Sequence, residues 1–239
     1  MNLNAFGKSP DLIAAISDKK DGSMRLIGDA GNNKLPLTNR KRFLEKYNIE
    51  LSNVVSAGLV LSNRIAVVNE KDKGKIIKNT DGLITKERNI YLSVTAADCL
   101  PVFFFDDMKK IIGLIHAGWQ GLEKNILGLA SKTFINYFHS NPDDIKVFIG
   151  PAICRFHYDV KSETAQKFIS IRGVVLNREG KLFLDIKRLA RIQLMENGIK
   201  KKNIKTSGRC TFKLKDRYFS WHRDKPKEME TMLAVFGRR

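Results

Sequence analysis

The 239-residue sequence has little cysteine: Cys99, Cys154 and Cys210 are its only three, and no two of them form a CxxC pair. An odd number leaves one thiol over in any disulfide scheme, which argues against a disulfide framework and indicates a reducing compartment. The sequence also lacks an apolar run long enough to cross a bilayer, and its N-terminal residues lack the apolar core of a signal peptide. These absences predict a cytoplasmic protein with no membrane partner.

Acidic residues are scarce beside basic ones: 25 Asp and Glu face 43 Lys and Arg, which gives a formal net charge of +18. Such an excess raises the question of a nucleic-acid partner. The lysines, however, are spread along nearly the whole chain, and aromatic residues are not interleaved with them as a single-strand-binding surface requires. We therefore expect a solvated basic surface rather than a nucleic-acid interface.

The chain also lacks internal repeats, low-complexity segments and linkers. Its hydrophobic fraction of 43% is enough to fill a core. The economical interpretation is a single mixed α/β domain over residues 1–239, present as a monomer or a small homo-oligomer.

The segment 95–121 carries the strongest signal that the sequence does have. Its two apolar runs, 102–105 and 111–115, flank a charged turn and predict an antiparallel hairpin. Cys99 precedes the first strand and His116 follows the second. Because antiparallel strands return to the same end of a sheet, we expect these two side chains to meet there.

A helix-like pattern over 122–137 follows the hairpin, and Gly118 and Gly121 flank its start. The first turn of a helix has backbone N–H groups without partners, so this end favours an anion.

The other patterns predict strands at 11–16, 81–85, 90–94, 146–149 and 182–184, a second hairpin from 54–61 and 64–68, and helices at 38–47 with Thr38 as N-cap, 161–168 and 185–197.

A cysteine and a histidine that meet support two chemistries. As thiolate and imidazole they can bind zinc or copper, but a catalytic zinc site takes three protein ligands, so a third is required. Alternatively, His116 can hold Cys99 as a nucleophilic thiolate, with Asp98 or Asp106 orienting the ring. The plain structural alternative is a small buried thiol beside a hydrogen-bonded histidine.

The other reactive residues give weaker signals. Trp119 can stack on a planar ligand or close the core under the helix. His222 and Arg223 follow an aromatic stretch that reads as a strand, and fit an exposed strand end. Cys154 and Cys210 fit ordinary buried thiols, and a ligand role for His157 has no support from its neighbours.

Several long motifs occur together and in order, and they cover most of the chain. They are Thr95–Val102 (TAADCLPV), His116–Trp119 (HAGW), Ile149–Ile153 (IGPAI) with Tyr158–Val160, and Phe219–Trp221 with Arg223–Asp224; Asn39–Arg40 and Asp81–Thr85 are weaker. Together they closely resemble the multicopper polyphenol oxidase, or laccase-domain, family, also called the YfiH-type purine nucleoside phosphorylase family.

The resemblance implies a four-layer α/β/β/α fold with mixed sheets. It also implies a zinc site formed by Cys99, His116 and a histidine from an early Q-x-H-G motif, in an enzyme that cleaves purine nucleosides with phosphate and deaminates adenosine. Copper is the alternative metal that the resemblance implies, because the family is also described as polyphenol oxidases or laccases. Cys99, His116 and Asp98 would then be catalytic, and the residues that would bind the nucleoside and phosphate are Asn39, Arg40, Gly118, Trp119, Gln120 and Arg223.

The sequence departs from the family pattern around this pocket. Leu61 stands where the motif has its metal-binding histidine, so the third ligand is missing. Gln120 replaces a basic residue, Glu230–Thr231 replace a Gly-Arg pair, and the glycine-rich motif expected around Lys19–Ser23 is not clearly present. His222 replaces a residue that is commonly arginine and could substitute as a ligand.

Three functions therefore remain open. The first is a purine nucleoside phosphorylase with possible adenosine deaminase activity at a Cys-His zinc site. The second is a metal-free Cys-His hydrolase or deamidase. The third is a non-catalytic member that keeps the fold.

Overall fold

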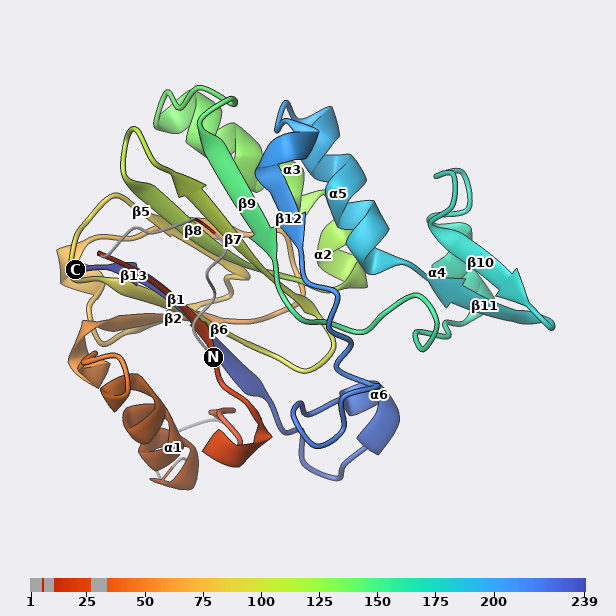
Figure 1. Cartoon of the computed structure of the whole chain (residues 1–239), viewed down its shortest axis with the longest axis horizontal. Helices are drawn as coiled ribbons and strands as arrows, with labels where there is room; N and C mark the ends of the chain where they lie inside the picture. The colour runs from red at the N-terminus through yellow and green to blue at the C-terminus, as the bar shows by residue number, and fades with distance from the viewer. Residues whose placement is uncertain (1–5, 7–10, 27–33) are drawn as a thin grey trace.

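The computed structural model describes residues 6, 11–26 and 34–239. Within them two β-sheets pack face to face (Figure 1). The first sheet has five strands, in the spatial order β1 (Leu12–Ile16), β13 (Met232–Arg238), β6 (Tyr91–Ala96), β2 (Val54–Gly58) and β4 (Ile76–Lys78). In this sheet β6 runs antiparallel to β13 and parallel to β2, so the carboxyl ends of β2 and β6 lie at one edge.

The second sheet contains the central hairpin. Its six strands are, in order, β12 (Ile204–Thr206), β9 (Ile145–Ile149), β7 (Leu100–Asp106), β8 (Ile111–Ala117), β5 (Gly82–Thr85) and β3 (Ile65–Val67). The antiparallel pairing of β7 with β8 confirms the predicted hairpin, and its register places Pro101 opposite His116.

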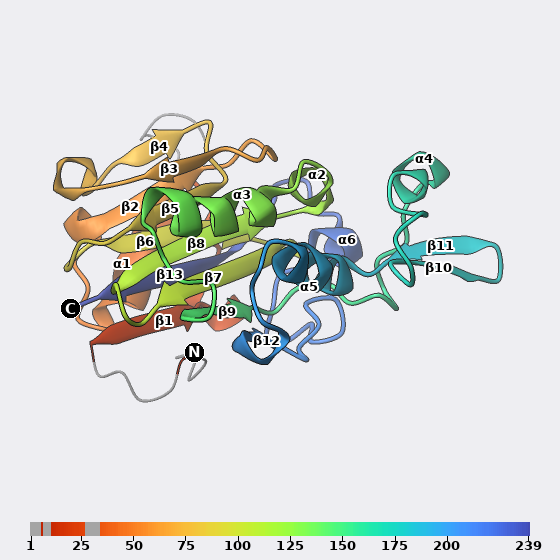
Figure 2. The ribbon, with the colours of Figure 1, turned by 90° about the horizontal axis from the view of Figure 1, so that it is seen from above.

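Helices cover the outer faces of both sheets. The helices are α1 (Lys34–Glu45), α2 (Trp119–Glu123), α3 (Ile126–Lys132), α4 (Ser162–Gln166), α5 (Ile186–Glu196) and α6 (Trp221–Asp224), with 3-10 turns at Lys19–Asp21, Leu51–Asn53, Glu70–Asp72 and Lys201–Asn203 and a π turn at Thr133–Tyr137. A two-stranded hairpin, β10 (Val175–Arg178) and β11 (Lys181–Leu184), projects from the layers beside α4 (Figure 2). None of the helices in the described part of the chain has the length and apolar character that a membrane crossing requires.

The apolar runs of the hairpin explain the stacking of the layers. Along β7, Val102 and Phe104 pack with the residues of α3 and α5, while Phe103 and Phe105 pack between the two sheets. Because successive strand residues point to opposite faces, an unbroken apolar run buries both faces of a sheet. A third cluster joins α1 to the first sheet. The four-layer α/β/β/α arrangement expected from the resemblance is therefore confirmed.

Most of the single elements also agree with the sequence. The predicted strands correspond to β1, β5, β6, β9 and β11, and the last two predicted helices to α4 and α5, with ends shifted by a few residues. Strands β4, β10 and β12 were not predicted, because each is three or four residues long and has little apolar pattern. The seven-residue strand β13 was not predicted either, although its sequence contains an apolar run.

The hairpin predicted from 54–61 and 64–68 is wrong. The two segments contribute to different sheets, since β2 pairs with β4 and β6 whereas β3 pairs with β5. The chain crosses from one sheet to the other between them. The N–H groups of residues 60–62 donate to the carboxylate of Asp81 instead of to a hairpin partner.

Two details of the helix predicted at 38–47 also differ, and so does one predicted strand end. Within the described residues helix α1 spans Lys34–Glu45, so it includes the turn that precedes Thr38. Thr38 is thus no N-cap, and its hydroxyl donates to the Lys34 carbonyl at 2.9 Å. The segment expected to end an aromatic strand forms the short helix α6, where the Ser220 hydroxyl caps the helix by accepting a hydrogen bond from the N–H of Arg223 at 3.2 Å.

The long helix predicted over 122–137 is interrupted. Helix α2 ends at Glu123 and α3 starts at Ile126. Between them Asn125 adopts a left-handed backbone with φ 56°, and its side chain accepts a hydrogen bond from the N–H of Gly128. The asparagine thus ends one helix and caps the next, as its short polar side chain permits.

Candidate functional site

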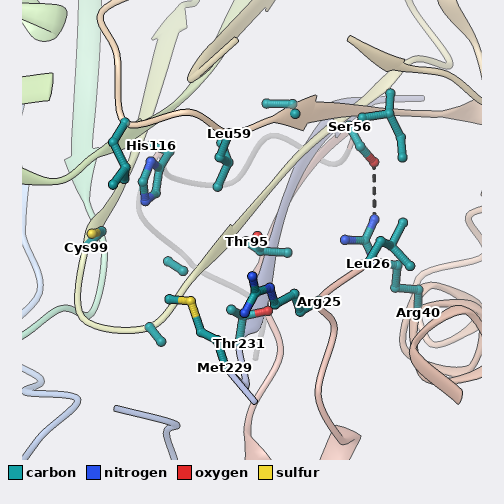
Figure 3. A pocket seen from close by; sticks show the side chains of 16 residues that line it. Arg25, Leu26, Arg40, Ser56, Leu59, Thr95, Cys99, His116, Met229 and Thr231 are labelled. Atoms are coloured by element: carbon teal, nitrogen blue, oxygen red, sulfur yellow. Dashed lines mark hydrogen bonds between the residues drawn. The ribbon is translucent and has the colours of Figure 1, made fainter. Parts of the chain in front are cut away.

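A cavity of about 430 Å³ lies at the edge where β2 and β6 end. Side chains from both sheets, from α1 and from the segment before β13 surround it (Figure 3). Its lining includes Arg25, Leu26, Arg40, Ser56, Leu59, Leu61, Ile76, Thr95, Cys99, His116, Met229 and Thr231. The cavity therefore combines an apolar wall with two guanidinium groups and the two residues that the hairpin brings together.

Cys99 and His116 lie beside each other at one end of this cavity (Figure 3). The hairpin register explains the contact, because Cys99 directly precedes β7 and His116 is the last residue but one of β8. Gly118 allows it: a Cβ atom at this glycine would lie 2.9 Å from the Cys99 sulfur. A larger residue at 118 would therefore push the thiol away from the ring.

The carboxylate of Asp81 holds the other side of the ring. It is fully buried, and its Oδ1 lies 3.1 Å from Nδ1 of His116. The same carboxylate accepts hydrogen bonds from the N–H groups of Val60, Leu61 and Ser62 at 3.3, 3.1 and 2.8 Å. One anion thus orients the histidine and fixes the crossing segment that carries residue 61.

Asp81 takes the orienting role for which the sequence had suggested Asp98 or Asp106. The sequence feature that could have pointed to Asp81 is the Asp81–Thr85 motif, whose first residue directly precedes a short apolar strand. Asp81 is distant from His116 in sequence, by 35 residues, and meets it only because β5 pairs with β8.

The charges around the ring act on its protonation. Burial lowers the pKa of His116, but Cys99 and Asp81 together outweigh burial and raise it to about 9. Burial also raises the pKa of Asp81, but the hydrogen bonds from His116 and Ser62 outweigh it and keep that pKa below its ordinary value. A protonated His116 paired with an ionised Asp81 is therefore favoured at neutral pH.

Asp98 has a different set of partners. Its carboxylate accepts hydrogen bonds from the hydroxyls of Thr211 and Ser220, at 2.5 and 3.0 Å, and from the N–H of His222 at 2.8 Å. It joins the loop before Cys99 to the C-terminal part of the chain. Asp106, at the far end of β7, accepts from the N–H groups of the following turn.

The six residues expected to bind substrate are distributed over several places. Arg40 lines the cavity, where its guanidinium donates to Ser56 Oγ at 3.3 Å, and Gly118 lies against Cys99. Asn39 lines a neighbouring cavity and donates to the Ser23 carbonyl. Only two of the six, Arg40 and Gly118, are therefore placed at the cavity or against its reactive pair.

Trp119, Gln120 and Arg223 are not among the described residues that line the cavity. Trp119 packs against the cluster between the second sheet and its helices, and Gln120 is half-exposed in α2. The guanidinium of Arg223 donates to the carbonyls of Thr211, Phe212 and Tyr218, so it braces the C-terminal segment.

Arg25 and Thr231 line the cavity and were missed as site residues. Thr231 was noted only as half of a pair that replaces Gly-Arg. It is 3% exposed, and within the described part of the chain its hydroxyl has no hydrogen-bond partner. Arg25 lies in a short irregular segment whose sequence gives no signal for its place.

A family-type metal site does not fit the residues beside Cys99 and His116. Leu61 occupies the third position: its Cδ2 would lie 3.9 Å from a Cβ atom placed on Gly118, close to the Cys99 sulfur. A leucine offers no lone pair to a metal, and His222, the candidate substitute, pairs with Asp159 at 2.6 Å. Two protein ligands fall short of the three that a catalytic zinc needs, so Cys99 and His116 do not by themselves form such a centre.

Residues 27–238 match the family model for multi-copper polyphenol oxidoreductase laccases. The chain belongs to this laccase family. The membership agrees with the resemblance seen in the sequence motifs.

Curated relatives of this laccase-family chain carry the name purine nucleoside phosphorylase. YlmD of Bacillus subtilis is 33% identical over 209 residues, which span 82% of this chain and 75% of that protein. A purine nucleoside phosphorylase of Aquifex aeolicus is 35% identical over 170 residues, 71% of this chain and 77% of the relative. The crystal structure of YlmD from Geobacillus stearothermophilus superposes with a TM-score of 0.90 at 28% identity, over 96% of this chain and 92% of that one.

Replacing Asp81 by asparagine tests its part in the site. Asp81→Asn removes the negative charge and keeps the shape of the side chain, so His116 and three backbone N–H groups lose their charged acceptor. We expect the free energy of unfolding to fall by about 3–5 kcal/mol. Urea denaturation measures this change. Asp107→Asn, which removes a partly exposed carboxylate paired with lysines, is the matched control, with a loss of about 0–1 kcal/mol. Equal losses in both variants would contradict the role given to Asp81.

Replacing Leu61 by histidine tests the missing ligand. Leu61 has φ 57°, and histidine is among the residues that adopt this left-handed conformation more readily than most. Leu61→His should bind one more equivalent of zinc than the parent protein does, as measured by metal analysis after gel filtration. Leu59→His, which also places an imidazole in the cavity lining, is the control and should bind none in addition. An unchanged zinc content in Leu61→His would show that residue 61 does not face the pair.

Proposed function

We propose that the cavity binds a purine nucleoside and phosphate, and that the protein cleaves the nucleoside by phosphorolysis without a metal at Cys99 and His116. The observation that carries this proposal is that the hydrogen-bonded array of Cys99, His116 and Asp81 opens on the same cavity as Arg25 and Arg40. The names of the relatives support the substrate class.

The two arginines supply the charge that phosphate needs. Arg40 is 5% exposed and is held by the Met24 carbonyl at 2.8 Å and by Ser56. Burial lowers its pKa to about 10, so the guanidinium stays charged at neutral pH. A buried, fixed guanidinium binds phosphate oxygens strongly because little solvent screens it. The unpartnered hydroxyl of Thr231 adds a donor on the same wall of the described cavity.

The apolar wall formed by Leu59, Leu61 and Ile76 suits the flat face of a purine base. In the reaction a phosphate oxygen forms a bond to the anomeric carbon of the ribose, and the bond from that carbon to the purine nitrogen breaks. The purine leaves with the electron pair and takes up one proton. His116 is the acid in this proposal: Asp81 fixes its Nδ1, and the opposite ring edge, which faces Cys99 at the end of the cavity, is the side from which the proton leaves.

The activity assay uses inosine and adenosine, each with and without phosphate, and follows the products by chromatography. Phosphate-dependent release of hypoxanthine or adenine with ribose 1-phosphate is the expected result. Base release that does not depend on phosphate would favour the Cys-His hydrolase, and no product would favour a binding protein; either outcome would contradict phosphorolysis. Ammonia release from adenosine would show deamination, and it would contradict phosphorolysis only where no phosphate-dependent base release accompanies it.

Arg40 and Arg42 make a matched pair for this assay, because they lie in the same helix but only Arg40 lines the described cavity. We expect Arg40→Met to raise the KM for phosphate and to lower kcat/KM by about 10²-fold or more, since it removes a buried charged contact worth about 3 kcal/mol. Arg42→Met, an exposed position, should stay within about twofold of the parent protein. Equal effects of the two variants would argue against a phosphate site at Arg40.

The rate should also depend on pH through His116. An acid must be protonated to act, so kcat/KM should fall as pH rises through about 9, the raised pKa of this ring. Asp81→Asn removes one of the charges that raise this pKa, and should move the falling limb to lower pH. The ionisation of phosphate is the same for the parent protein and for Asp81→Asn. If kcat/KM falls at the same pH in both proteins, His116 is excluded as the group that causes the fall.

A further inference from the structure

Cys154, His157 and Cys210 form a second cysteine-histidine cluster, outside the lining of the cavity that holds Cys99 and His116. The Cys154 sulfur lies 3.1 Å from Nδ1 of His157, and the Cys210 sulfur lies 3.7 Å from the same nitrogen. The two sulfurs and the nitrogen all lie within 4.8 Å of one another. One ring nitrogen therefore faces both thiols.

These distances match a tetrahedral zinc centre. Zinc bonds of about 2.3 Å to sulfur and about 2.0–2.1 Å to nitrogen, at a tetrahedral angle, place a sulfur and a nitrogen about 3.6 Å apart. The two observed separations, 3.1 and 3.7 Å, lie on either side of this value. Only small movements of the side chains would be needed to admit the ion.

The backbone holds the three ligands in place without help from a metal. The N–H of His157 donates to the Cys154 carbonyl at 3.0 Å, so the two lie on one turn after β9. The third ligand comes from the C-terminal part of the chain, where Cys210 forms a parallel bridge with Ala152. The ring of His157 also stacks on Phe212, with centroids 4.6 Å apart and planes at 20°. A preformed site of this kind loses little freedom on binding.

The surroundings suit an ion that enters from solvent and stays bound. Cys210 is 6% exposed, whereas Cys154 and His157 are half-buried, which leaves one side of the cluster accessible. The ammonium of Lys187 is near enough for the two sulfurs to act on its charge, and it is fixed by the carbonyls of Ser207 and Arg209. Burial raises the pKa of the Cys154 thiol and Lys187 offsets only part of that rise, so the metal itself has to displace the thiol proton.

We propose that Cys154, His157 and Cys210 bind one zinc ion through two thiolates and Nδ1, with water as the fourth ligand. Two sulfurs and one imidazole select a thiophilic ion and disfavour magnesium or calcium, which prefer oxygen. Binding displaces the two thiol protons to solvent, and the ion balances the two negative charges that remain.

The ion would fasten the turn after β9 to the C-terminal segment close to the candidate active site. The N–H of Ile153 donates to the Asp98 carbonyl at 3.1 Å, and the hydroxyl of Thr211 donates to the Asp98 carboxylate. Ile153 and Thr211 are the direct neighbours of two of the three ligands. The zinc would therefore brace the loop that presents Cys99, from a position outside the substrate cavity.

The experiment separates this cluster from the pair at Cys99. The full-length Cys99→Ser protein, which lacks the other thiol, is purified without added metal and loaded with zinc. One zinc per chain should remain after gel filtration, and X-ray absorption at the zinc edge should show two sulfur neighbours. Cys99→Ser combined with Cys154→Ser should lose this zinc, and His157→Ala should weaken binding by at least about 100-fold in a competition with a chromophoric chelator.

Controls keep a misfolded variant from being mistaken for a lost ligand. His157→Cys keeps a ligand at the position and should retain one metal, with a third sulfur in the absorption data. His139→Ala, which removes a histidine from a turn outside the cluster, should bind zinc like the parent protein. Cobalt offers a second readout, since thiolate ligands give it a strong near-ultraviolet absorption that Cys154→Ser should reduce.

Two results would overturn the proposal. One is a Cys99→Ser protein that folds, as judged by circular dichroism, and binds no zinc. The other is a disulfide between Cys154 and Cys210 in protein kept under reducing conditions, seen as a mass lower by two hydrogens and as two missing free thiols.

Discussion

The carboxylate of Asp81 is the interaction on which the candidate site depends. It lies at the start of β5, beside the end of β8, and is sealed from solvent. Buried without partners, it would strongly destabilise the fold. Its partners are the N–H groups of residues 60–62, the Ser62 hydroxyl and the His116 ring, so the fold satisfies the charge by assembling the site.

This constraint also explains why residue 61 matters although leucine has no reactive group. The N–H groups of Val60, Leu61 and Ser62 all donate to Asp81, and the Leu61 side chain lies near the Cys99 sulfur. Leu61 gives the cavity an apolar wall at this point and offers no ligand atom to a metal. Membership of the laccase family therefore fixes the scaffold, while one side chain changes the chemistry that the scaffold can offer.

Asp98 is a second buried carboxylate that holds a segment of the site in place, in this case the loop that leads into Cys99. Its backbone has φ 85°, a strained value for a residue other than glycine, and its three donors come from the distant C-terminal segment. The Cys154–His157–Cys210 cluster lies on the same two segments that Asp98 joins. The loop that presents Cys99 is thus held by Asp98 and its partners, and the second cluster lies next to those contacts.

Much of the fold could be predicted from the sequence alone. The apolar runs of β7 and β8 and the charged turn between them determined the hairpin, because period and turn chemistry are local properties. The meeting of Cys99 with His116 followed from strand direction. The four layers followed from the motifs of the family, and the packing of Phe103 and Phe104 on opposite faces of β7 agrees with them.

Only the tertiary structure decided what surrounds these residues. The pairing of Asp81 with His116 spans 35 residues, and the contact between Cys154 and Cys210 spans 56. The failed hairpin at 54–68 has the same origin, since a buried carboxylate far along the chain took the N–H groups that a local turn would have used. Local pattern determines which strands and helices can form, but the partners of buried charges and thiols depend on which strands lie side by side, and that is settled only when the sheets pack.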